Sequence, residues 1–135
     1  MLTVENWITS SNKYPERAKS IELTDDVKAN AAILIAKVNA LLSDLGVSDK
    51  LSVSSGFRPS SVNSGIANAA KRSAHMSGKA IDIVDLDGKL KGLVASRPDL
   101  LRTHELFMED SGSTPTWMHL DFITRVDRPT RTFKP

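Results

Sequence analysis

The chain has 135 residues and a formal net charge of +2, with 40% hydrophobic and 25% charged residues. This length and composition are typical of one folded domain with its own apolar core, and we expect residues 1–135 to form a single domain. No run of about twenty apolar residues occurs, so we expect no membrane-spanning helix and no membrane partner. The chain contains no cysteine, which excludes disulfide bonds and leaves histidine and carboxylate side chains as the protein ligands of any metal.

The basic residues are scattered along the chain rather than gathered on one segment. Domains that bind nucleic acid carry a strong basic face with interleaved aromatic residues, whereas only 5% of the residues here are aromatic. We therefore expect no nucleic acid partner; a basic nucleic-acid module, the alternative, would bind DNA in a salt-sensitive way. We interpret the densest basic patch as a solvated tail, with weak attraction to an anionic polymer such as a bacterial cell wall as the alternative. It comprises Arg125, Arg128, Arg131 and Lys134.

The first 23 residues show no sustained period, and we expect an ordered arm or loop with one short helix. They lack a basic start followed by an apolar stretch, so we expect no secretory signal. From Thr24 the apolar residues follow a helical period, with Thr24 as the N-cap and Gly46 just beyond the C-terminal end. We expect this long helix, of about 20 residues, to form the backing of the core. Its apolar stripe comprises Val27, Ala31, Leu34, Ile35, Val38, Leu41, Leu42 and Leu45.

Short strands are predicted at residues 50–54, 79–84, 105–109 and 116–123. In the second strand, Ile81 and Ile83 share one face, and Ala80 and Asp82 share the other. Between the strands, the sequence predicts a loop with a short helix at 60–71, a turn at 85–88 and a helix at 90–102 that is interrupted near Pro98. The last two strands are joined as a hairpin by residues 110–115. This order indicates an α+β domain with a small, mainly antiparallel sheet.

Three side chains that are far apart in the sequence have the chemistry of a metal site. Asp82 lies on the polar face of its strand, and His75 lies in a loop of small residues, SAHMSG. His119 shares one face of its strand with Trp117 and Asp121. Two imidazoles and one carboxylate can hold a zinc ion with one position left open for water. Spacing alone leaves open the alternative that these are structural, hydrogen-bonded histidines, which is how we interpret the third one, His104.

Three blocks of the sequence form a recognisable pattern: SSGFRP at residues 54–59, SAHMSGKAID at residues 73–82 and WMH at residues 117–119. They resemble the signature of the M15 class of zinc D-Ala-D-Ala carboxypeptidases. The matching pattern is S-G-[FY]-R-[PS], then S-x-H-x-x-G-x-A-x-D, then W-x-H. It occurs in this order and reaches from about residue 52 to residue 122. The class includes vancomycin-resistance dipeptidases and phage endolysins, and the resemblance implies a zinc cleft on the sheet.

Carried over position by position, the resemblance implies that His75, Asp82 and His119 are the zinc ligands. Arg58 resembles the family arginine that meets the substrate carbonyl or carboxylate, and its planar fork of donors suits that role. Ser73 resembles a serine that contacts the substrate, with a role as a loop cap as the alternative.

The general base is the point at which the sequence departs from one branch of the class. Vancomycin-resistance members carry a glutamate three residues before the last histidine ligand, but here Thr116 occupies that position. Other members, and the related hedgehog domains, place the glutamate at the end of the preceding strand, which corresponds to Glu109. A hairpin centred near residue 114 would place Glu109 opposite His119, and a slip of one residue would turn it away. We expect Glu109 to be the base. The reserve candidates are Asp110 and Asp121, and Asp121 has the alternative role of orienting a ligand imidazole.

The resemblance implies a zinc-dependent peptidase that cleaves peptidoglycan stem peptides, either between D-alanines or between L-alanine and D-glutamate. We expect a monomeric, phage-type lytic enzyme that is cytoplasmic until released to the cell wall, or that is associated with the virion. A small cytoplasmic dipeptidase is an alternative, and manganese or iron could replace zinc. Because Thr116 replaces a family glutamate, a non-catalytic zinc-containing domain that binds cell wall or protein is the rival interpretation.

Overall fold

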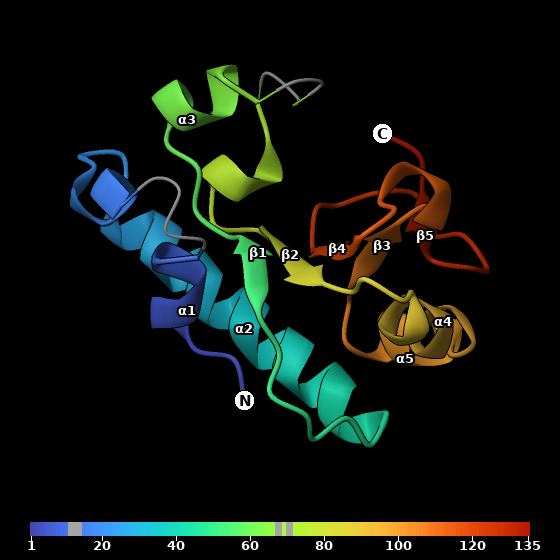
Figure 1. Cartoon of the computed structure of the whole chain (residues 1–135). Helices are drawn as coiled ribbons and strands as arrows, with labels where there is room; N and C mark the ends of the chain where they lie inside the picture. Colours follow the sequence, from blue (N-terminus) through green and yellow to red (C-terminus); the bar gives the residue numbers. More distant parts are fainter. Residues whose placement is uncertain (11–14, 67–68, 70–71) are drawn as a thin grey trace.

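The computed structural model of the chain describes residues 1–10, 15–66, 69 and 72–135. Their centre is a five-stranded sheet with the strand order β1-β2-β4-β3-β5 (Figure 1). Within the described residues, β3 and β5 run parallel and the other three strand pairs are antiparallel. The predicted α+β class with a mainly antiparallel sheet is therefore confirmed. The strands are β1 (Val53–Ser55), β2 (Ala80–Val84), β3 (Phe107–Glu109), β4 (Trp117–Asp121) and β5 (Thr132–Phe133).

The helices surround this sheet, and α2 (Asp25–Asp44) runs across it with α1 (Val4–Ile8) at its side (Figure 1). Thr24 accepts a hydrogen bond from the Val27 amide and caps the first turn of α2. Gly46, at a φ of +72°, closes the last turn, because its amide bonds to Ser43 and the next amide bonds to Leu42. Both predicted ends of the helix are confirmed.

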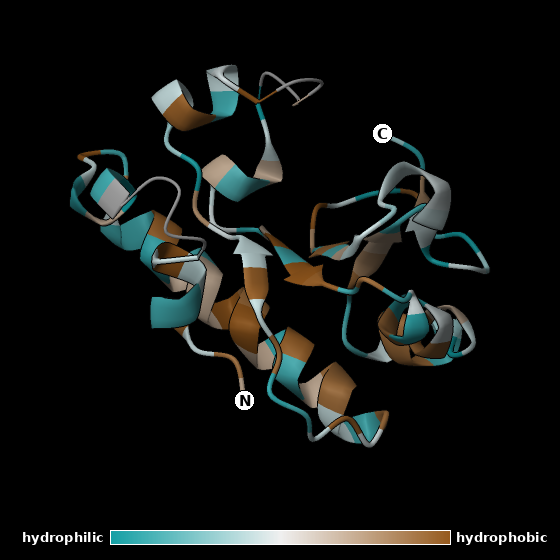
Figure 2. Ribbon diagram, viewed as in Figure 1, coloured by the Kyte–Doolittle hydropathy of each residue, from teal (hydrophilic) through white to brown (hydrophobic). Residues whose placement is uncertain are grey.

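Six residues of the predicted stripe of α2 are buried, and Val27 and Leu45 are partly buried against the same core; Figure 2 shows hydrophobic segments of this helix beside β1. The same core contains the side chains of one face of β2 and β4, namely Ile81, Ile83, Met118 and Leu120. Several helices, rather than α2 alone, pack on this face of the sheet. Trp7, Leu90, Val94 and Leu101 from the other helices belong to the same core. The alternation predicted for β2 is confirmed, since its polar residue Asp82 lies on the face away from this core.

Two residues of the N-terminal segment, Leu2 and Trp7, are buried in the core. Thr3 caps α1 and forms a capping box with Asn6. Trp7 is fully buried, and its indole N–H donates to the carbonyl oxygen of Ala80 at 2.8 Å. The short helix predicted within residues 1–23 is confirmed, and a second turn, η1 (Pro15–Lys19), follows it. Residues 11–14 of the predicted arm lie outside the described residues.

The remaining helices are short and lie near the ends of the strands. The turn predicted at residues 85–88 is confirmed, and both oxygens of Asp85 accept amide hydrogens from the first turn of α4. The interruption predicted near Pro98 separates α4 from α5. Of the segment predicted at 60–71, α3 is described, and 67–68 and 70–71 lie outside the described residues. No helix in the described ranges has the length and apolar character needed to cross a membrane. These helices are α3 (Ser60–Ser64), α4 (Lys89–Ala95) and α5 (Pro98–Thr103), with the turns η2 (Ala74–Met76) and η3 (Ser111–Ser113).

The interpretation of the C-terminal basic patch as a solvated tail is wrong for two of its four residues. Arg131 is buried, its guanidinium lies 3.8 Å from the ring centre of Phe107, and it donates to the carbonyl of Leu106. Arg125 is partly buried and forms an ion pair with the buried carboxylate of Asp121. The segment is held because β5 adds a parallel strand to β3, which the sequence analysis did not predict.

Candidate metal and catalytic site

The pairing of β2 with β4 brings two of the predicted ligands together. Asp82 and His119 are direct cross-strand partners in an antiparallel register. Their neighbours on the opposite face fill the core, so both side chains are directed to the other face of the sheet. The Nδ1 atom of His119 lies 2.7 Å from Oδ1 of Asp82. Two residues that are 37 positions apart in the chain therefore form one contact.

The third predicted ligand, His75, lies in the turn η2 just before β2. Ser73 caps this turn, because its hydroxyl accepts a hydrogen bond from the His75 amide. The chain then returns to the sheet through Gly78, whose φ of +83° suits glycine. A Cβ at Gly78 would lie 2.3 Å from the carbonyl oxygen of Val27, so this loop is packed against the first turn of α2. The ring of His75 is thereby placed 5.4 Å from that of His119, centre to centre.

The hydrogen bonds of His75 determine which of its nitrogens faces the cluster. Its Nδ1 lies 2.8 Å from the carbonyl oxygen of Gly56. Because a carbonyl oxygen only accepts, Nδ1 carries the hydrogen. Burial of the ring, which outweighs the nearby carboxylate of Asp82, lowers the pKa of His75 and favours the neutral form. The unprotonated Nε2 then faces Oδ2 of Asp82 at 3.4 Å, so that two acceptors point at one another.

His119 lies between two carboxylates. Its Nε2 is 2.9 Å from Oδ2 of Asp121, and its Nδ1 faces Asp82. A neutral imidazole can donate from only one nitrogen, so it cannot satisfy both carboxylates. Burial opposes a charged ring, but the hydrogen bonds to Asp121 and Asp82 outweigh it and raise the pKa of His119 to about 9. A metal cation bound at Nδ1 would balance the negative charge of Asp82 as the proton does.

These contacts fit a metal ion. One ligand atom from each of His75, Asp82 and His119 lies within 4.8 Å of the other two, and all three residues are buried. Despite burial, the hydrogen bond and the positive charge of the His119 imidazole hold the pKa of Asp82 well below its usual range, so Asp82 stays ionised. Two imidazole nitrogens and a carboxylate are a typical ligand set of catalytic zinc. The other ring nitrogen of His75 donates to the carbonyl oxygen of Gly56, and that of His119 donates to the carboxylate of Asp121. Metal-binding histidines usually donate in this way to a carbonyl or a carboxylate.

Arg58 lies at the edge of this cluster, and its side chain is only 12% exposed. It donates from one terminal nitrogen to Oδ2 of Asp82 at 3.1 Å and from Nε to the hydroxyl of Ser55 at 2.9 Å. The guanidinium is therefore fixed beside the predicted ligands. Burial lowers the pKa of Arg58 from its usual value, because it outweighs the attraction of the Asp82 and Glu109 carboxylates. Ser73, by contrast, is engaged as the cap of η2, which is the alternative role named for it above.

Glu109 reaches the same place from β3. Phe107 and Met108 pair with Asp121 and Leu120, and this register, continued by one residue, would bring Glu109 opposite His119. One carboxylate oxygen of Glu109 lies 3.9 Å from Nδ1 of His119. Partial burial, only partly offset by His119, raises the pKa of this carboxyl above its usual value. Glu109 is therefore a carboxylate that lies beside the predicted ligands, at a distance from His119 that is longer than a hydrogen bond.

The two reserve candidates for the general base, Asp110 and Asp121, make other contacts. The Asp110 carboxylate lies beside Gly112, in the turn that follows β3. Asp121 contacts the Nε2 side of His119, away from the nitrogen that faces Asp82. His104 pairs with Asp44, outside the cluster.

The family model of the M15 peptidases, described as Peptidase M15, matches residues 10–121. The chain belongs to the peptidase M15 family. Members of this family are in general zinc-dependent, which agrees with the His-Asp-His group of this M15 peptidase. No curated protein matches the chain.

Sequence reasoning missed several residues that support the site of this M15 peptidase. The carbonyl of Gly56 orients His75, and the backbone of Trp7 bonds to the adjacent amide of Phe57 at 3.1 Å. Arg125 and Phe133 lie behind His119. The sequence did show a spacing of four between Asp121 and Arg125 and between Asp127 and Arg131, but this spacing predicts an ion pair only on a helix, and no helix was predicted there.

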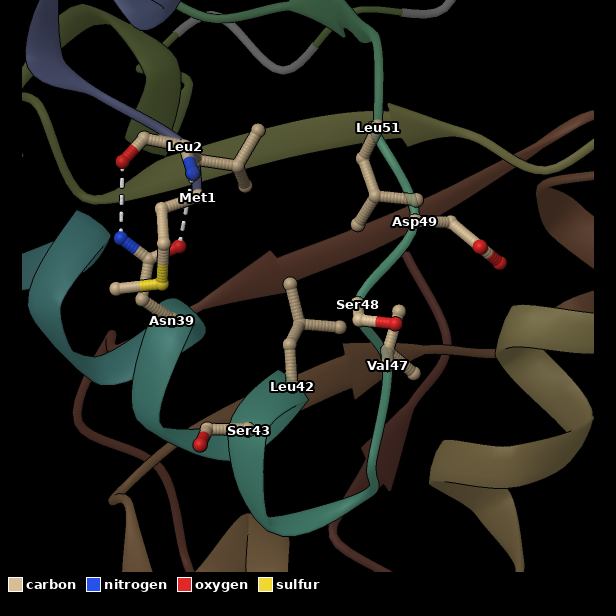
Figure 3. A pocket seen from close by; sticks show the side chains of 9 residues that line it. All are labelled: Met1, Leu2, Asn39, Leu42, Ser43, Val47, Ser48, Asp49 and Leu51. Atoms are coloured by element: carbon tan, nitrogen blue, oxygen red, sulfur yellow. Dashed lines mark hydrogen bonds between the residues drawn. The ribbon is translucent and has the colours of Figure 1, made fainter.

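A separate hollow of ≈ 270 Å³ lies between the N-terminal residues, α2 and the segment that leads into β1 (Figure 3). The backbone of Leu2 is held there by the side-chain amide of Asn39, through hydrogen bonds of 3.0 and 2.9 Å. His75, Asp82 and His119 do not contribute to its lining, so the hollow has no part in the chemistry of the cluster. It is lined by Met1, Leu2, Asn39, Leu42, Ser43, Val47, Ser48, Asp49 and Leu51.

Proposed function

We propose that this protein is a zinc-dependent peptidase that hydrolyses peptidoglycan stem peptides, with His75, Asp82 and His119 as the zinc ligands. The observation that carries the proposal is the position of Glu109, a half-buried carboxylate 3.9 Å from the ligand nitrogen of His119. Membership of the M15 family supports peptide hydrolysis. The resemblance of the three motif blocks to cell-wall carboxypeptidases and endolysins supports a D-Ala-D-Ala or an L-Ala-D-Glu bond as the target.

Glu109 is assigned the role of general base. Its carboxylate takes a proton from the attacking water and returns it to the leaving amine, and its raised pKa suits both steps. When bound, zinc would supply a positive charge that polarises the scissile carbonyl and lowers the pKa of a water molecule. Glu109 takes over a task that vancomycin-resistance members give to a glutamate at the position of Thr116, which is exposed here.

Arg58 is assigned to the substrate. In the described contacts, its Nε and one terminal nitrogen are engaged by Ser55 and Asp82, which fixes the plane of the guanidinium. Arginine has five N–H donors in a rigid fork, so donors remain to bind the substrate carbonyl and the negative charge that develops on it. Ser73 is an additional candidate for substrate contact through the edge of the turn that it caps.

The test uses the purified, zinc-loaded protein on bacterial peptidoglycan, with mass spectrometry of the released muropeptides to identify the cleaved bond. We expect Glu109→Gln to lower the rate by about 10²- to 10⁴-fold while zinc stays bound. Asp110→Asn is the matched control, because it removes the neighbouring carboxylate from the turn, and it should retain activity. Full activity of Glu109→Gln would remove this residue from the mechanism.

The rival proposal is a domain that keeps zinc but only binds its target, and Thr116 is the observation that favours it. The two proposals separate in the same assay. A zinc-loaded wild-type protein that sediments with peptidoglycan but releases no peptide would support the binding domain. Release of peptides by the wild type, and its loss in Glu109→Gln, would exclude it.

The phage-type lytic role, a single domain spanning residues 1–135, a monomeric state and release from the cytoplasm to the cell wall are further parts of the proposal. Light scattering of the purified protein tests the oligomeric state. Comparison of lysis from within cells with lysis after external addition tests where the enzyme acts.

A further inference from the structure

A chain of contacts runs behind His119, on the side away from Asp82. The carboxylate of Asp121 is almost fully buried and accepts from Nε2 of His119. The guanidinium of Arg125 binds both oxygens of the same carboxylate: one terminal nitrogen donates to Oδ1, and the other donates to Oδ2 at 3.0 Å. This paired geometry fixes the orientation of the Asp121 carboxylate more strictly than a single hydrogen bond would.

Phe133 completes the arrangement. The guanidinium of Arg125 lies over its ring, 3.6 Å from the centre. The same ring packs against His119 at a steep angle, with 5.8 Å between ring centres and 77° between planes. His119, Asp121, Arg125 and Phe133 thus form a closed circle of contacts. Phe133 reaches this position because β5 pairs with β3, with Glu109 and Phe133 as register partners.

Two of these residues lie outside the part of the chain that the family model matches. That match ends at residue 121, whereas Arg125 and Phe133 follow it. The segment that carries them therefore lies beyond the matched region.

We propose that Arg125 and Phe133 are positioning residues for His119, Arg125 acting through the Asp121 carboxylate and Phe133 by direct contact with the imidazole ring. The proposal rests on the assignment of His119 as a zinc ligand. Arg125 holds the Asp121 carboxylate in the position where it accepts from Nε2 of His119, so that Nδ1 presents its lone pair to the ion. Phe133 prevents the imidazole from tilting. Partners of this kind typically contribute about 10- to 100-fold to metal affinity.

The test measures zinc affinity by competition with a chromogenic chelator, and the ligand field by the visible spectrum of the Co²⁺-loaded protein. We expect Arg125→Ala to weaken zinc binding by about 10- to 100-fold. Arg125→Lys, which keeps the charge but not the fork, should restore part of this loss. Phe133→Leu should give a smaller loss, together with a changed Co²⁺ spectrum.

Arg131→Ala is the matched control. Arg131 belongs to the same segment and also stacks on Phe107, but its ion-pair partner is Asp127 rather than Asp121. Its removal should lower the thermal stability of the chelator-treated protein and leave zinc affinity unchanged. Equal zinc affinity of Arg125→Ala and the wild type, or an equal loss in Arg131→Ala, would overturn the proposal.

The outcomes also separate this proposal from the proposed function. A wild-type protein that binds no zinc overturns both. Zinc binding that is weakened by Arg125→Ala, in a protein that cleaves no peptide, supports the positioning role and overturns the peptidase activity. Peptide cleavage with unaltered zinc affinity in Arg125→Ala and Phe133→Leu overturns the positioning role alone.

Discussion

The backbone of Gly56 lies directly against the carbonyl of Trp7, so closely that a Cβ at residue 56 would come within 2.0 Å of that carbonyl oxygen. The amide of Phe57 donates to the same oxygen. Gly56 in turn offers its own carbonyl to His75. The N-terminal helix and the candidate metal site are therefore connected through one glycine.

We predict that Gly56→Ala destabilises the protein and weakens zinc binding. The added methyl group meets backbone atoms that cannot move aside, and crowding of this kind typically costs about 1–3 kcal/mol. The displaced carbonyl would no longer hold the ring of His75. Urea denaturation of chelator-treated protein and zinc titration measure the two effects.

Gly92→Ala is the control for this prediction. Gly92 lies in α4, and nothing lies within 4 Å of a Cβ built there. Alanine should therefore stabilise the helix by about 0.5–1 kcal/mol and leave zinc binding unaffected. Gly56→Ala with the stability and zinc affinity of the wild type would contradict the close approach to Trp7.

A second prediction concerns the pH dependence of the chelator-treated protein. The pKa of His119 is raised from its ordinary value of 6.5 to about 9 in the folded state. A raised pKa means that the folded state holds the proton more tightly, so its contribution to stability is complete below pH 6.5 and is lost as the pH rises through about 9. The free energy of unfolding should decline across this window.

The measurement is urea denaturation at several pH values, with His119→Gln as the comparison. The variant cannot take up this proton, so its decline across the window should be smaller. Equal slopes for the two proteins would mean that His119 is not paired with Asp82 and Asp121 as the structure has it.

A third prediction distinguishes the three histidines of the chain. A ligand that binds only the folded state raises its stability, by about 2.7 kcal/mol at one hundred times the dissociation constant. For a domain of this size, this corresponds to a shift in Tm on the order of 10 °C. We expect zinc to raise the Tm of the wild type and of His104→Gln, because His104 pairs with Asp44 outside the cluster. His75→Gln and His119→Gln should lose most of this shift, and a full shift in either would remove that residue from the ligand set.

The elements that could be predicted are those whose pattern repeats within a short stretch. The stripe of α2 and the alternation of β2 are each visible within one element, because they reflect the fixed periods of helix and strand. The assumed centre of the hairpin near residue 114 agrees with the pairing of Phe107 with Asp121 and of Met108 with Leu120. The grouping of His75, Asp82 and His119 followed from motif blocks rather than from periodicity.

The features that could not be predicted depend on contacts between distant parts of the chain. Trp7 stands among polar residues without a period, and its burial depends on Gly56 and on Ala80, which is 73 residues away. A strand as short as β5 shows no alternation. Arg125 and Arg131 are charged, and their burial depends on Phe107 and Phe133, whose neighbouring positions arise only when the sheet is complete.

The direct pairing of Asp82 with His119 also bears on how the sheet avoids misalignment. A slip of one residue between β2 and β4 would send the two side chains to opposite faces. An ion that needs both side chains as ligands can bind only when the two strands are correctly aligned. Its binding therefore stabilises the correct register and no misaligned one. On the proposed assignment, the bound ion therefore favours the correct alignment of the sheet as well as serving its chemistry, and misaligned pairings of β2 with β4 should become rarer as zinc rises.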